Sequence, residues 1–359
     1  MTREINGYVS DLPLGCITET DIYTDKGALL CQKMTVVDNH LMDKISHYHG
    51  KIHAVISYVP DEPVITVVPE PDTSIKFDPA FKKYAEETLK NILKNVDDVK
   101  TLTQGAKEVG EQVYSIIENS NELIVNLSKL KISDEYTYKH SIDVGTMAAV
   151  LAKYMGETDK FVHDIAIAGL LHDVGKEKIP VEIIQKPAKL TAEEYEIIKR
   201  HPLYAYKLLM DSKDLSEKML QGILNHHENV DGTGYPRGLS GEQIGKMAQI
   251  LSIVDVYDAL VTKRSYKDAK SPAQAIEIMF TMSNKFNIDY FKAFLDVIIT
   301  YPNGSEVLLS TGETATVMKQ NKSYPLRPVI KVAGSEKSID LANDSHYLST
   351  VIINFANAS

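Results

Sequence analysis

The chain has 359 residues, 43% of them hydrophobic and 25% charged, a composition typical of a globular protein with sizeable cores. The formal net charge of −10 excludes a general binder of duplex nucleic acid, because no surplus of Lys and Arg is available to neutralise phosphates. No window reaches the roughly 18 apolar residues that span a membrane, the first residues lack a signal-peptide layout, and the two cysteines fit no disulfide framework. We therefore expect a cytoplasmic protein.

Residues 1–68 mix strand-like and helical patterns and predict a small α+β accessory or regulatory module. The β-branched runs HAVISYV and VITVV are typical of strands. The run TVVDNHLMDKISHYHG has helical spacing and predicts a helix that stops at Gly50. The segment 69–80 is rich in proline and acid and predicts a linker.

Residues 81–302 are predicted to be helical almost throughout. Apolar residues recur every three or four positions from Leu89 to Leu102, which predicts one amphipathic helix whose stripe serves core packing or a homodimer seam. The runs EVLLS, TATVMK and PVIKV predict a small β-rich extension over residues 303–359. The expected fold class is therefore mainly α, with an all-helical core between a small α+β module and a small β-rich extension.

Several histidines and acids stand at helix ends or inside apolar helices. His172 precedes Asp173 in LLHDVGK, where an apolar helix is expected to stop at Gly175 as a C-terminal cap. Asp255 lies in an otherwise apolar helix, where a buried acid is costly unless it is paired or metal-bound. The other candidates are His140, His201, His226 and His227. A helix-end hydrogen bond explains any one of them, but together they predict a divalent metal site.

Two motifs resemble the signatures of a known family. HDVGK at 172–176 and HHENVDGTGYP at 226–236 resemble the HD-GYP family, a subgroup of the HD-domain metal-dependent phosphohydrolases. The resemblance covers about residues 120–300. It implies a helical HD-type core and a cyclic di-GMP phosphodiesterase that opens its substrate to linear pGpG with a metal-bridging hydroxide. Whether the reaction continues to GMP is left open.

The resemblance also implies the cofactor and its ligands. We expect two divalent metal ions, Fe, Mn or Ni. One ion would be held by His140, His172, Asp173 and Asp255. Asp173 would bridge to a second ion held by His201, His226 and His227. Neighbouring residues in an ideal helix point about 100° apart. His226 and His227 can therefore share a centre only if their helix ends there.

Further residues are assigned by the same resemblance. Asp173 and Lys176 are the catalytic candidates, with Lys176 touching a phosphate oxygen; the alternative for Lys176 is a solvated lysine at a helix end. Arg264 and Lys267 would add phosphate contacts, or form an exposed basic turn. Tyr235 would shape the substrate rim. Glu228 and Asp231 are expected to orient the histidines or the loop.

One position departs from part of the family. Some members carry a glutamate one helical turn before the first histidine, where it holds a third metal ion. This chain has Tyr136 there, and Glu135 and Asp134 lie off that helical face. We therefore expect two metal ions.

Two alternative functions stay open. The first is an HD phosphohydrolase acting on another cyclic dinucleotide or nucleotide, because a loop motif does not fix base identity. The second is a catalytically silent cyclic-dinucleotide sensor or protein-interaction module. The expected partner is cyclic di-GMP or a related cyclic dinucleotide. A homodimer and signalling proteins are further expected partners.

Overall fold

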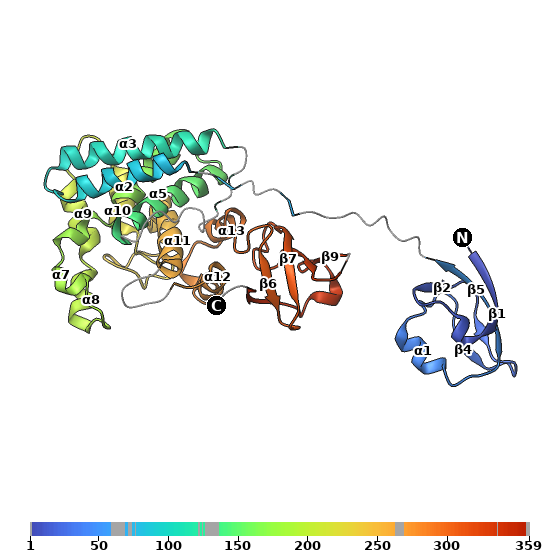
Figure 1. Ribbon diagram of the computed structural model, residues 1–359. Coiled ribbons are helices and arrows are strands. Elements are labelled where there is room, and N and C mark those ends of the chain that lie inside the picture. The colour runs from blue at the N-terminus through green and yellow to red at the C-terminus, as the bar shows by residue number, and fades with distance from the viewer. Residues whose placement is uncertain are drawn as a thin grey trace. The chain divides into compact units, whose positions relative to one another are not determined.

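The computed structural model describes residues 2–58, 69–70, 74–75, 77–120, 123, 125, 136–262, 269–335 and 337–356, except the side chains of residues 58, 136 and 137. It divides into two compact units, residues 1–67 and 68–359 (Figure 1). In the described part of the chain, no helix has both the length and the apolar character needed to cross a membrane. The predicted boundaries near residues 80 and 302 fall inside the second unit and stay predictions.

The first unit is a small α+β module. Its elements are β1 (Thr2–Tyr8), η1 (Val9–Asp11), β2 (Cys16–Thr18), β3 (Ile22–Tyr23), β4 (Leu29–Cys31), α1 (Asn39–Ile45) and β5 (Lys51–Tyr58). Strands β1, β5 and β2 form an antiparallel sheet in that order, and β3 pairs with β4. Cys16 and Cys31 are reduced and buried in the core of this unit. The predicted strand VITVV lies outside the described residues.

Helix α1 is shorter than its spacing predicts. It begins after Asp38, whose side chain caps the helix by accepting from the Leu41 amide, and it ends at Ile45 rather than at Gly50. Tyr48 continues the chain as a turn and donates its hydroxyl to Asp25. The expected stop at Gly50 is therefore wrong by about one helical turn.

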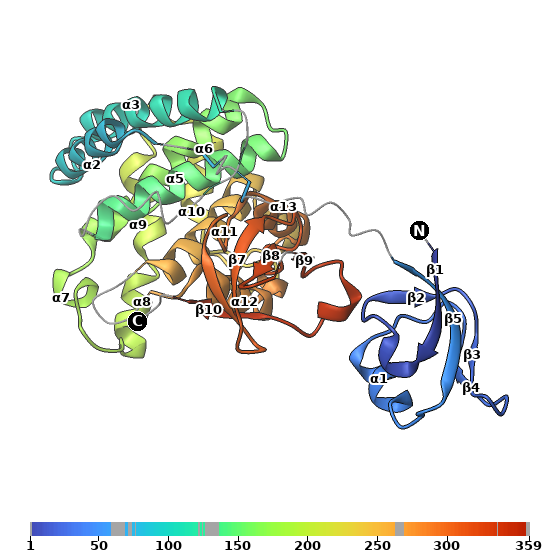
Figure 2. The ribbon, with the colours of Figure 1, turned by 45° about the vertical axis from the view of Figure 1, so that its right-hand side comes forward.

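The second unit is a helical body, and the fold class is mainly α as predicted (Figures 1 and 2). Its elements before residue 200 are α2 (Pro79–Leu93), α3 (Val99–Glu118), α5 (Tyr136–Tyr154), α6 (Asp159–Leu171), η2 (Val174–Lys178), α7 (Val181–Ile184) and α8 (Ala192–Ile198). They continue with α9 (His201–Leu209), α10 (Glu217–Asn225), η3 (Gly241–Gln243), α11 (Lys246–Val261), α12 (Pro272–Thr281), η4 (Ser283–Lys285) and α13 (Ile288–Val297).

The apolar stripe from Leu89 to Leu102 belongs to two helices, so the single helix predicted from it is wrong. Helix α2 ends at Leu93, and α3 begins after Asp98, whose carboxylate accepts from the Thr101 amide. A side chain that caps a new helix overrides the continuous periodicity. The stripe packs into the main core of the chain, which favours the core-packing interpretation over a dimer seam.

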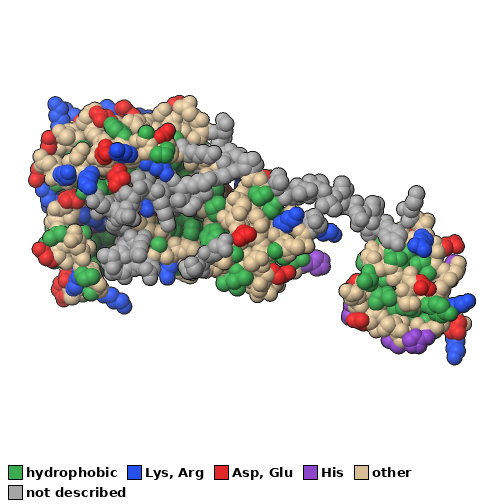
Figure 3. All heavy atoms as spheres, in the orientation of Figure 1, with side chains coloured by type: hydrophobic (Ala, Val, Ile, Leu, Met, Phe, Trp, Pro, Cys, Tyr) green, Lys and Arg blue, Asp and Glu red, His purple; other side chains and the backbone are tan. Residues whose placement is uncertain are grey.

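The C-terminal residues form the predicted β-rich extension. Its elements are β6 (Glu306–Leu309), β7 (Thr314–Lys319), β8 (Val329–Val332), β9 (Ser338–Asp340), η5 (Ser345–Tyr347) and β10 (Ile352–Phe355). The antiparallel strand order is β10-β6-β7-β8-β9. Ala273 of α12 joins the buried core of this sheet, so the extension packs directly on the helical body. Acidic and basic side chains are interspersed over the face of the helical body seen in Figure 3.

The described part of the predicted linker is in contact with the second unit. Ile75 and Phe77 are buried in the main core. The Glu70 amide donates to the carbonyl of Met318, and the Glu70 carboxylate pairs with Lys319 at 2.9 Å. Glu70 thus contacts β7 of the β-rich extension, and Ile75 and Phe77 pack into the helical core just before α2 begins.

Candidate metal centre

The seven predicted metal ligands converge from different helices on one place in the helical body. His140 comes from α5, Asp255 from α11, and the other five stand at or just beyond helix ends. All are buried except His227, whose side chain is 22% exposed. These residues are His140, His172, Asp173, His201, His226, His227 and Asp255. Buried imidazoles and carboxylates of this number are costly to desolvate unless they bind each other or a cation.

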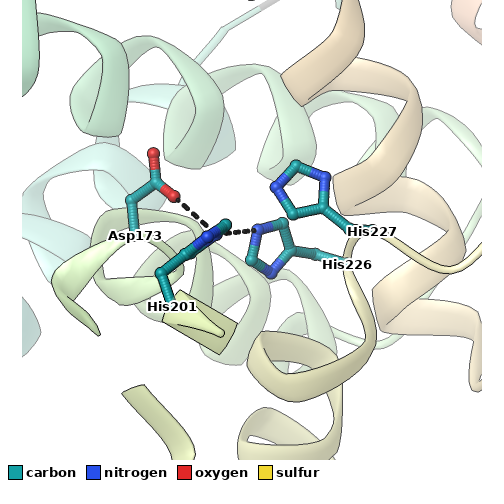
Figure 4. Close-up of side chains that lie close together, drawn as sticks. All are labelled: Asp173, His201, His226 and His227. Carbon is teal, nitrogen blue, oxygen red and sulfur yellow. Dashed lines mark hydrogen bonds and ion pairs between the residues drawn. The ribbon is translucent and has the colours of Figure 1, made fainter. Parts of the chain in front are cut away.

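The seven side chains fall into two groups, each with ligand atoms within 4.8 Å of one another. The first group is Asp173, His201, His226 and His227, drawn in Figure 4. The second group is His140, His172 and Asp255. Each group offers the imidazole and carboxylate donors that first-row divalent metals prefer.

Asp173 lies between the two groups. Its Oδ1 atom is 3.2 Å from Nε2 of His201 in the first group. Its Oδ2 atom is 3.4 Å from Nε2 of His140 and 3.4 Å from Nε2 of His172 in the second group. The two oxygens of one carboxylate thus face two donor sets, which is the geometry required of a bridging ligand.

The paired histidines reach the site because their helix ends before them. Helix α10 stops at Asn225, with His226 as its C-terminal cap. The two imidazole centroids are then 4.1 Å apart and tilted by 43°. Figure 4 shows the His226 ring next to His201, which in turn contacts Asp173, and the His227 ring beside His226. The helix end that the sequence analysis requires is confirmed.

Gly175 does not cap the helix that carries His172, so that expectation is wrong. Helix α6 ends at Leu171, and Gly175 lies inside the following η2 turn. A Cβ atom there would lie 2.0 Å from the carbonyl oxygen of His201 and 2.5 Å from the amide of Ala205. Gly175 is therefore required by the close packing of η2 on α9, which holds Asp173 beside His201.

Three of the histidines have their protonation fixed by the backbone. The Nδ1 atoms of His172, His201 and His226 bond to the carbonyl oxygens of the residues three positions earlier, at 2.7, 2.8 and 2.6 Å. A carbonyl only accepts, so each Nδ1 carries a proton, and a ring that has no second proton keeps a lone pair on Nε2. Nε2 of His201 and Nε2 of His226 are nevertheless only 3.3 Å apart.

Two facing lone pairs repel unless a cation lies against both. His172 presents the same problem, because its buried Nε2 has no hydrogen-bond partner among the described residues and faces the carboxylate of Asp173. Buried polar atoms normally have partners. The donor set therefore fits divalent metal ions.

Asp258 was missed in the sequence analysis and completes the surroundings of His140. Its Oδ2 atom is 2.6 Å from Nδ1 of His140, and its side chain is buried. Its Oδ1 atom accepts from the hydroxyl of Thr262 at 3.2 Å. A carboxylate that accepts from Nδ1 directs Nε2 toward the metal and raises the basicity of the ring. The signal was a second acid three residues after Asp255, on the same face of an apolar helix.

The electrostatics keep most of the site deprotonated. Burial and the neighbouring histidines hold the pKa of His226 well below its usual value, and burial lowers the pKa of His227 to about 3. Burial opposes charge on Asp255, but hydrogen bonding and charge from His140 and nearby histidines prevail and hold its pKa well below the usual range. Metals bind neutral imidazole and ionised carboxylate, so these shifts favour metal binding near neutral pH.

The predicted substrate contacts have different outcomes. Lys176 forms an ion pair with Asp173, and its side chain is 27% exposed, so its ammonium group stands at the open edge of the site. The ring centroid of Tyr235 lies 4.7 Å from that of His227, and the role of Tyr235 at a substrate rim stays a prediction. Arg264 and Lys267 lie outside the described residues.

The glycine-rich loop is fixed by its acids. Buried Glu228 accepts from the amide of Arg237 at 2.6 Å and from the amide of Leu239 at 3.0 Å, so it shapes the loop rather than a histidine. Asp231 accepts from Thr233 within the loop. At Gly234 a Cβ atom would meet the amide of Asn229 at 2.3 Å, so the loop folds against its own backbone.

The position that bears on a third metal ion is only partly described. Helix α5 begins at Tyr136, one helical turn before His140, as the spacing predicts. The side chain of Tyr136 and residues 134 and 135 lie outside the described part of the chain. The number of metal ions therefore stays a prediction.

The chain is similar to several phosphodiesterases that act on cyclic dinucleotides. The chain is 39% identical over 230 residues to the cyclic di-GMP phosphodiesterase PA4108 of Pseudomonas aeruginosa, covering 64% of this chain and 55% of that protein. It is 33% identical over 217 residues to a cyclic di-GMP phosphodiesterase of Thermotoga maritima, covering 60% of this chain and 58% of that protein. It is 33% identical over 172 residues to the 3'3'-cGAMP-specific phosphodiesterase 1 of Vibrio cholerae, covering 47% and 39%. The chain thus spans little more than half the length of the first two relatives.

A family model described as the HD domain matches residues 111–290, which is half of the chain. The match includes all seven converging ligands, both sequence motifs and Asp258. The chain therefore belongs to the HD-domain family and, within it, to the HD-GYP group whose two motifs it carries.

Proposed function

We propose that this chain is a metal-dependent cyclic di-GMP phosphodiesterase with a two-metal centre. The observation that carries the proposal is the pair of donor sets joined by Asp173, with the Nε2 atoms of His201 and His226 facing each other at 3.3 Å. Two relatives, from Pseudomonas aeruginosa and Thermotoga maritima, are cyclic di-GMP phosphodiesterases, which supports the substrate. Fe, Mn and Ni suit the mixed imidazole and carboxylate ligands.

Two divalent ions, when bound, supply a Lewis acid for the phosphodiester and lower the pKa of a water molecule toward neutrality. The chain's own residues do the positioning. Asp173 joins the two donor sets, because Oδ2 faces His140 and Oδ1 faces His201. Lys176 is within reach of Asp173 at the open edge of the site and offers its ammonium group to a phosphate oxygen. That contact stabilises the charge that develops as the P–O bond breaks.

The expected product is linear pGpG. Cleavage of one phosphodiester opens the ring, and a further cleavage to GMP requires the linear product to bind again. A glutamate one turn before His140 is absent from this chain, so we propose a centre of two metal ions and accumulation of pGpG. Residues 81–302 would carry this activity, and residues 1–68 would act as an accessory module.

Hydrolysis of a related cyclic dinucleotide is the main competing function. It is supported by the similarity to a 3'3'-cGAMP-specific phosphodiesterase of Vibrio cholerae. The two activities share the metal chemistry and differ only in base recognition. Cytoplasmic placement is part of the same proposal, because a cyclic dinucleotide acts as an intracellular signal. A homodimer and signalling-protein partners stay predictions.

The test is a product assay with purified, metal-loaded protein. Cyclic di-GMP, 3'3'-cGAMP and cyclic di-AMP are supplied separately, and products are separated by chromatography. We expect fastest conversion of cyclic di-GMP to pGpG and no conversion by Asp173→Ala. Faster cleavage of 3'3'-cGAMP would reassign the substrate. Binding of cyclic di-GMP without any cleavage would instead establish the silent sensor.

A further inference from the structure

Residues 180–200, here called the arm, join two parts of the candidate metal centre without entering the core. The arm follows the η2 turn that contains Lys176, and it ends immediately before His201. It contains α7 and α8, and none of its residues is buried. Figures 1 and 2 both show α7 and α8 projecting from the helical body beyond α9. The arm is thus tied to the site at both ends but contributes little to the core.

Local interactions keep the arm ordered. The Thr191 side chain caps α8 by accepting from the Glu194 amide, and Glu194 accepts in return from the Thr191 amide. The carboxylate of Glu194 also pairs with Lys186 at 2.7 Å, which closes the turn between α7 and α8. A capping box of this kind defines where a helix begins. The arm therefore holds its side chains in fixed places without being buried.

A row of rings and one cation leads from the metal ligands to the arm. The ring of Tyr235 lies 4.7 Å from the His227 ring. Nζ of Lys199 lies 6.0 Å from the centroid of the Tyr235 ring and 5.4 Å from the centroid of the Tyr195 ring. Tyr195 is 48% exposed, although it is a large aromatic residue beside a buried site. The row thus ends on an aromatic face open to solvent.

We propose that Tyr195 and Lys199 bind the half of the cyclic dinucleotide that is not being cleaved, with the Tyr195 ring stacking on its base and Lys199 contacting its phosphate. Below, Tyr195, Lys199 and Tyr235 are called the lip. This inference rests on the proposed function, because it assigns a second contact for the same substrate. The metal centre holds one phosphodiester, and a cyclic dinucleotide carries a second phosphate and a second base that need partners.

The chemistry of the lip suits a nucleotide. Aromatic faces stack on bases of any identity, and such stacks contribute substantially to binding of single-stranded nucleotides. A cation over aromatic rings is attracted to their faces and remains available to an anion. Lys199 also pairs with exposed Glu196, but an exposed ion pair is worth little and can be exchanged for a phosphate.

A purely structural role for Tyr195 is disfavoured by its surroundings. Helix α8 buries no side chain, so removing the Tyr195 ring leaves no cavity in a core. Tyr84 on α2 provides a matched control, because it is 37% exposed and donates its hydroxyl to Glu108. Lys207 on α9 provides the control for Lys199, because it is exposed and lies in the last turn of the helix that begins with His201.

The test compares two substrates in the full-length, metal-loaded protein. Cyclic di-GMP has a second phosphate and a second purine, whereas bis(p-nitrophenyl) phosphate has one phosphodiester, two small nitrophenyl rings, no second phosphate and no purine. For Tyr195→Ala we expect KM for cyclic di-GMP to rise about 5- to 150-fold, the range for loss of one base stack. For the same variant, the fold-increase in KM for bis(p-nitrophenyl) phosphate should be at most one fifth of the fold-increase for cyclic di-GMP. Lys199→Ala should also raise KM more for cyclic di-GMP than for bis(p-nitrophenyl) phosphate. The controls Tyr84→Ala and Lys207→Ala should leave both KM values unchanged.

The variant Tyr195→Phe separates stacking from the hydroxyl group. It retains the ring, so its KM for cyclic di-GMP should stay within about twofold of the wild-type value. An equal loss with both substrates, or no loss with either, would overturn the inference. Metal content is measured in each variant and should match the wild-type protein.

Equilibrium binding of cyclic di-GMP, measured in parallel, separates this inference from the proposed function. If the wild-type protein binds cyclic di-GMP without cleaving it, the proposed function fails, and the affinity of Tyr195→Ala then decides the inference. Weaker binding in that variant supports the inference that Tyr195 contacts the second nucleotide, and unchanged binding overturns it. A wild-type protein that does not bind cyclic di-GMP contradicts both.

Discussion

The metal centre and the arm adjoin in the sequence but differ in how they are held in place. His172, Asp173 and His201 are buried among helix ends, where backbone carbonyls and a close glycine contact fix each side chain. Residues 180–200 between them contain no buried residue and depend on a capping box and surface ion pairs. A metal site needs rigid geometry, which the buried helix ends supply, whereas an exposed segment such as the arm tolerates more change in its side chains.

The largest expected effect comes from the residue that joins the two donor sets. Asp173→Ala should reduce phosphodiesterase activity to background and remove most bound metal, because both sets lose a shared carboxylate. Elemental analysis and circular dichroism should show a folded protein with little metal. Unchanged metal content would show that Asp173 is not a bridge. The variant Asp211→Ala, at an exposed position after α9, is the matched control and should keep both metal and activity.

The next effect should fall on turnover alone. Lys176→Ala removes a charged phosphate contact without removing a metal ligand, which typically costs about 2–4 kcal/mol of transition-state stabilisation. That corresponds to a decrease in kcat of roughly 30- to 900-fold. Steady-state kinetics with metal analysis should show the decrease at full metal content. If Lys176→Ala had wild-type kinetics, Lys176 would be a solvated lysine at a helix end and not a phosphate contact.

Asp258→Asn tests whether the carboxylate that is hydrogen-bonded to His140 affects metal affinity. The amide oxygen can still accept from Nδ1 of His140, but it carries no negative charge to raise the basicity of the ring, so metal affinity should fall about 10- to 100-fold. Competition with a chromophoric chelator measures this affinity directly. Asp289→Asn removes an exposed carboxylate from α13 and should leave the affinity unchanged. An affinity for Asp258→Asn within twofold of wild type would contradict the role assigned to Asp258.

The smallest effect should be a pH dependence of the metal-free protein. The pKa values of His172, His226 and His227 are lowered in the folded state by burial, in His227 to about 3 against an ordinary 6.5. Below pH 6.5 the unfolded chain therefore takes up more protons, and the free energy of unfolding should fall toward pH 3. The pKa of His140 is raised because bonds to carboxylates outweigh burial, so its contribution changes above pH 6.5 and is nearly constant over this range.

Denaturant titrations in the presence of a chelator measure this pH dependence. The His227→Asn variant should show a shallower decrease between pH 6.5 and pH 4, because one buried imidazole is gone. A free energy of unfolding that stays constant or rises as the pH falls over this range would contradict the assigned shifts. The arm contains no histidine, and the pKa values of its Glu193 and Glu194, which hydrogen bonds lower, affect stability only near the acid end of this range.

Much of the site could be predicted because its signals are local. The adjacent pair His226 and His227 required a helix end, and α10 ends at Asn225. The motif at 172–176 placed an acid beside a histidine, and the structure brings Asp173 between two groups of histidines. These features depend on residues close in sequence, so periodicity and motif could indicate them.

What could not be predicted depends on distant partners. Asp258 is identified by its bond to His140, which lies 118 positions earlier; its spacing from Asp255 indicates a shared helix face but not that distant partner. Gly175 resembled a helix cap but is required by the backbone of α9. Asp98 begins a new helix inside an unbroken apolar stripe, because capping overrides periodicity. Tyr195 and Lys199 were missed for the same reason, since Lys199 lies near both Tyr195 and Tyr235 only in the folded chain.

The central claim is that seven side chains form one two-metal site bridged by Asp173. The most direct measurement is metal stoichiometry at saturation in the wild-type protein and in Asp173→Ala, by elemental analysis of protein freed from loosely bound ions. The account predicts two divalent ions per chain in the wild type and fewer than one in the variant. Two ions retained in Asp173→Ala, or none bound by the wild type, would contradict it.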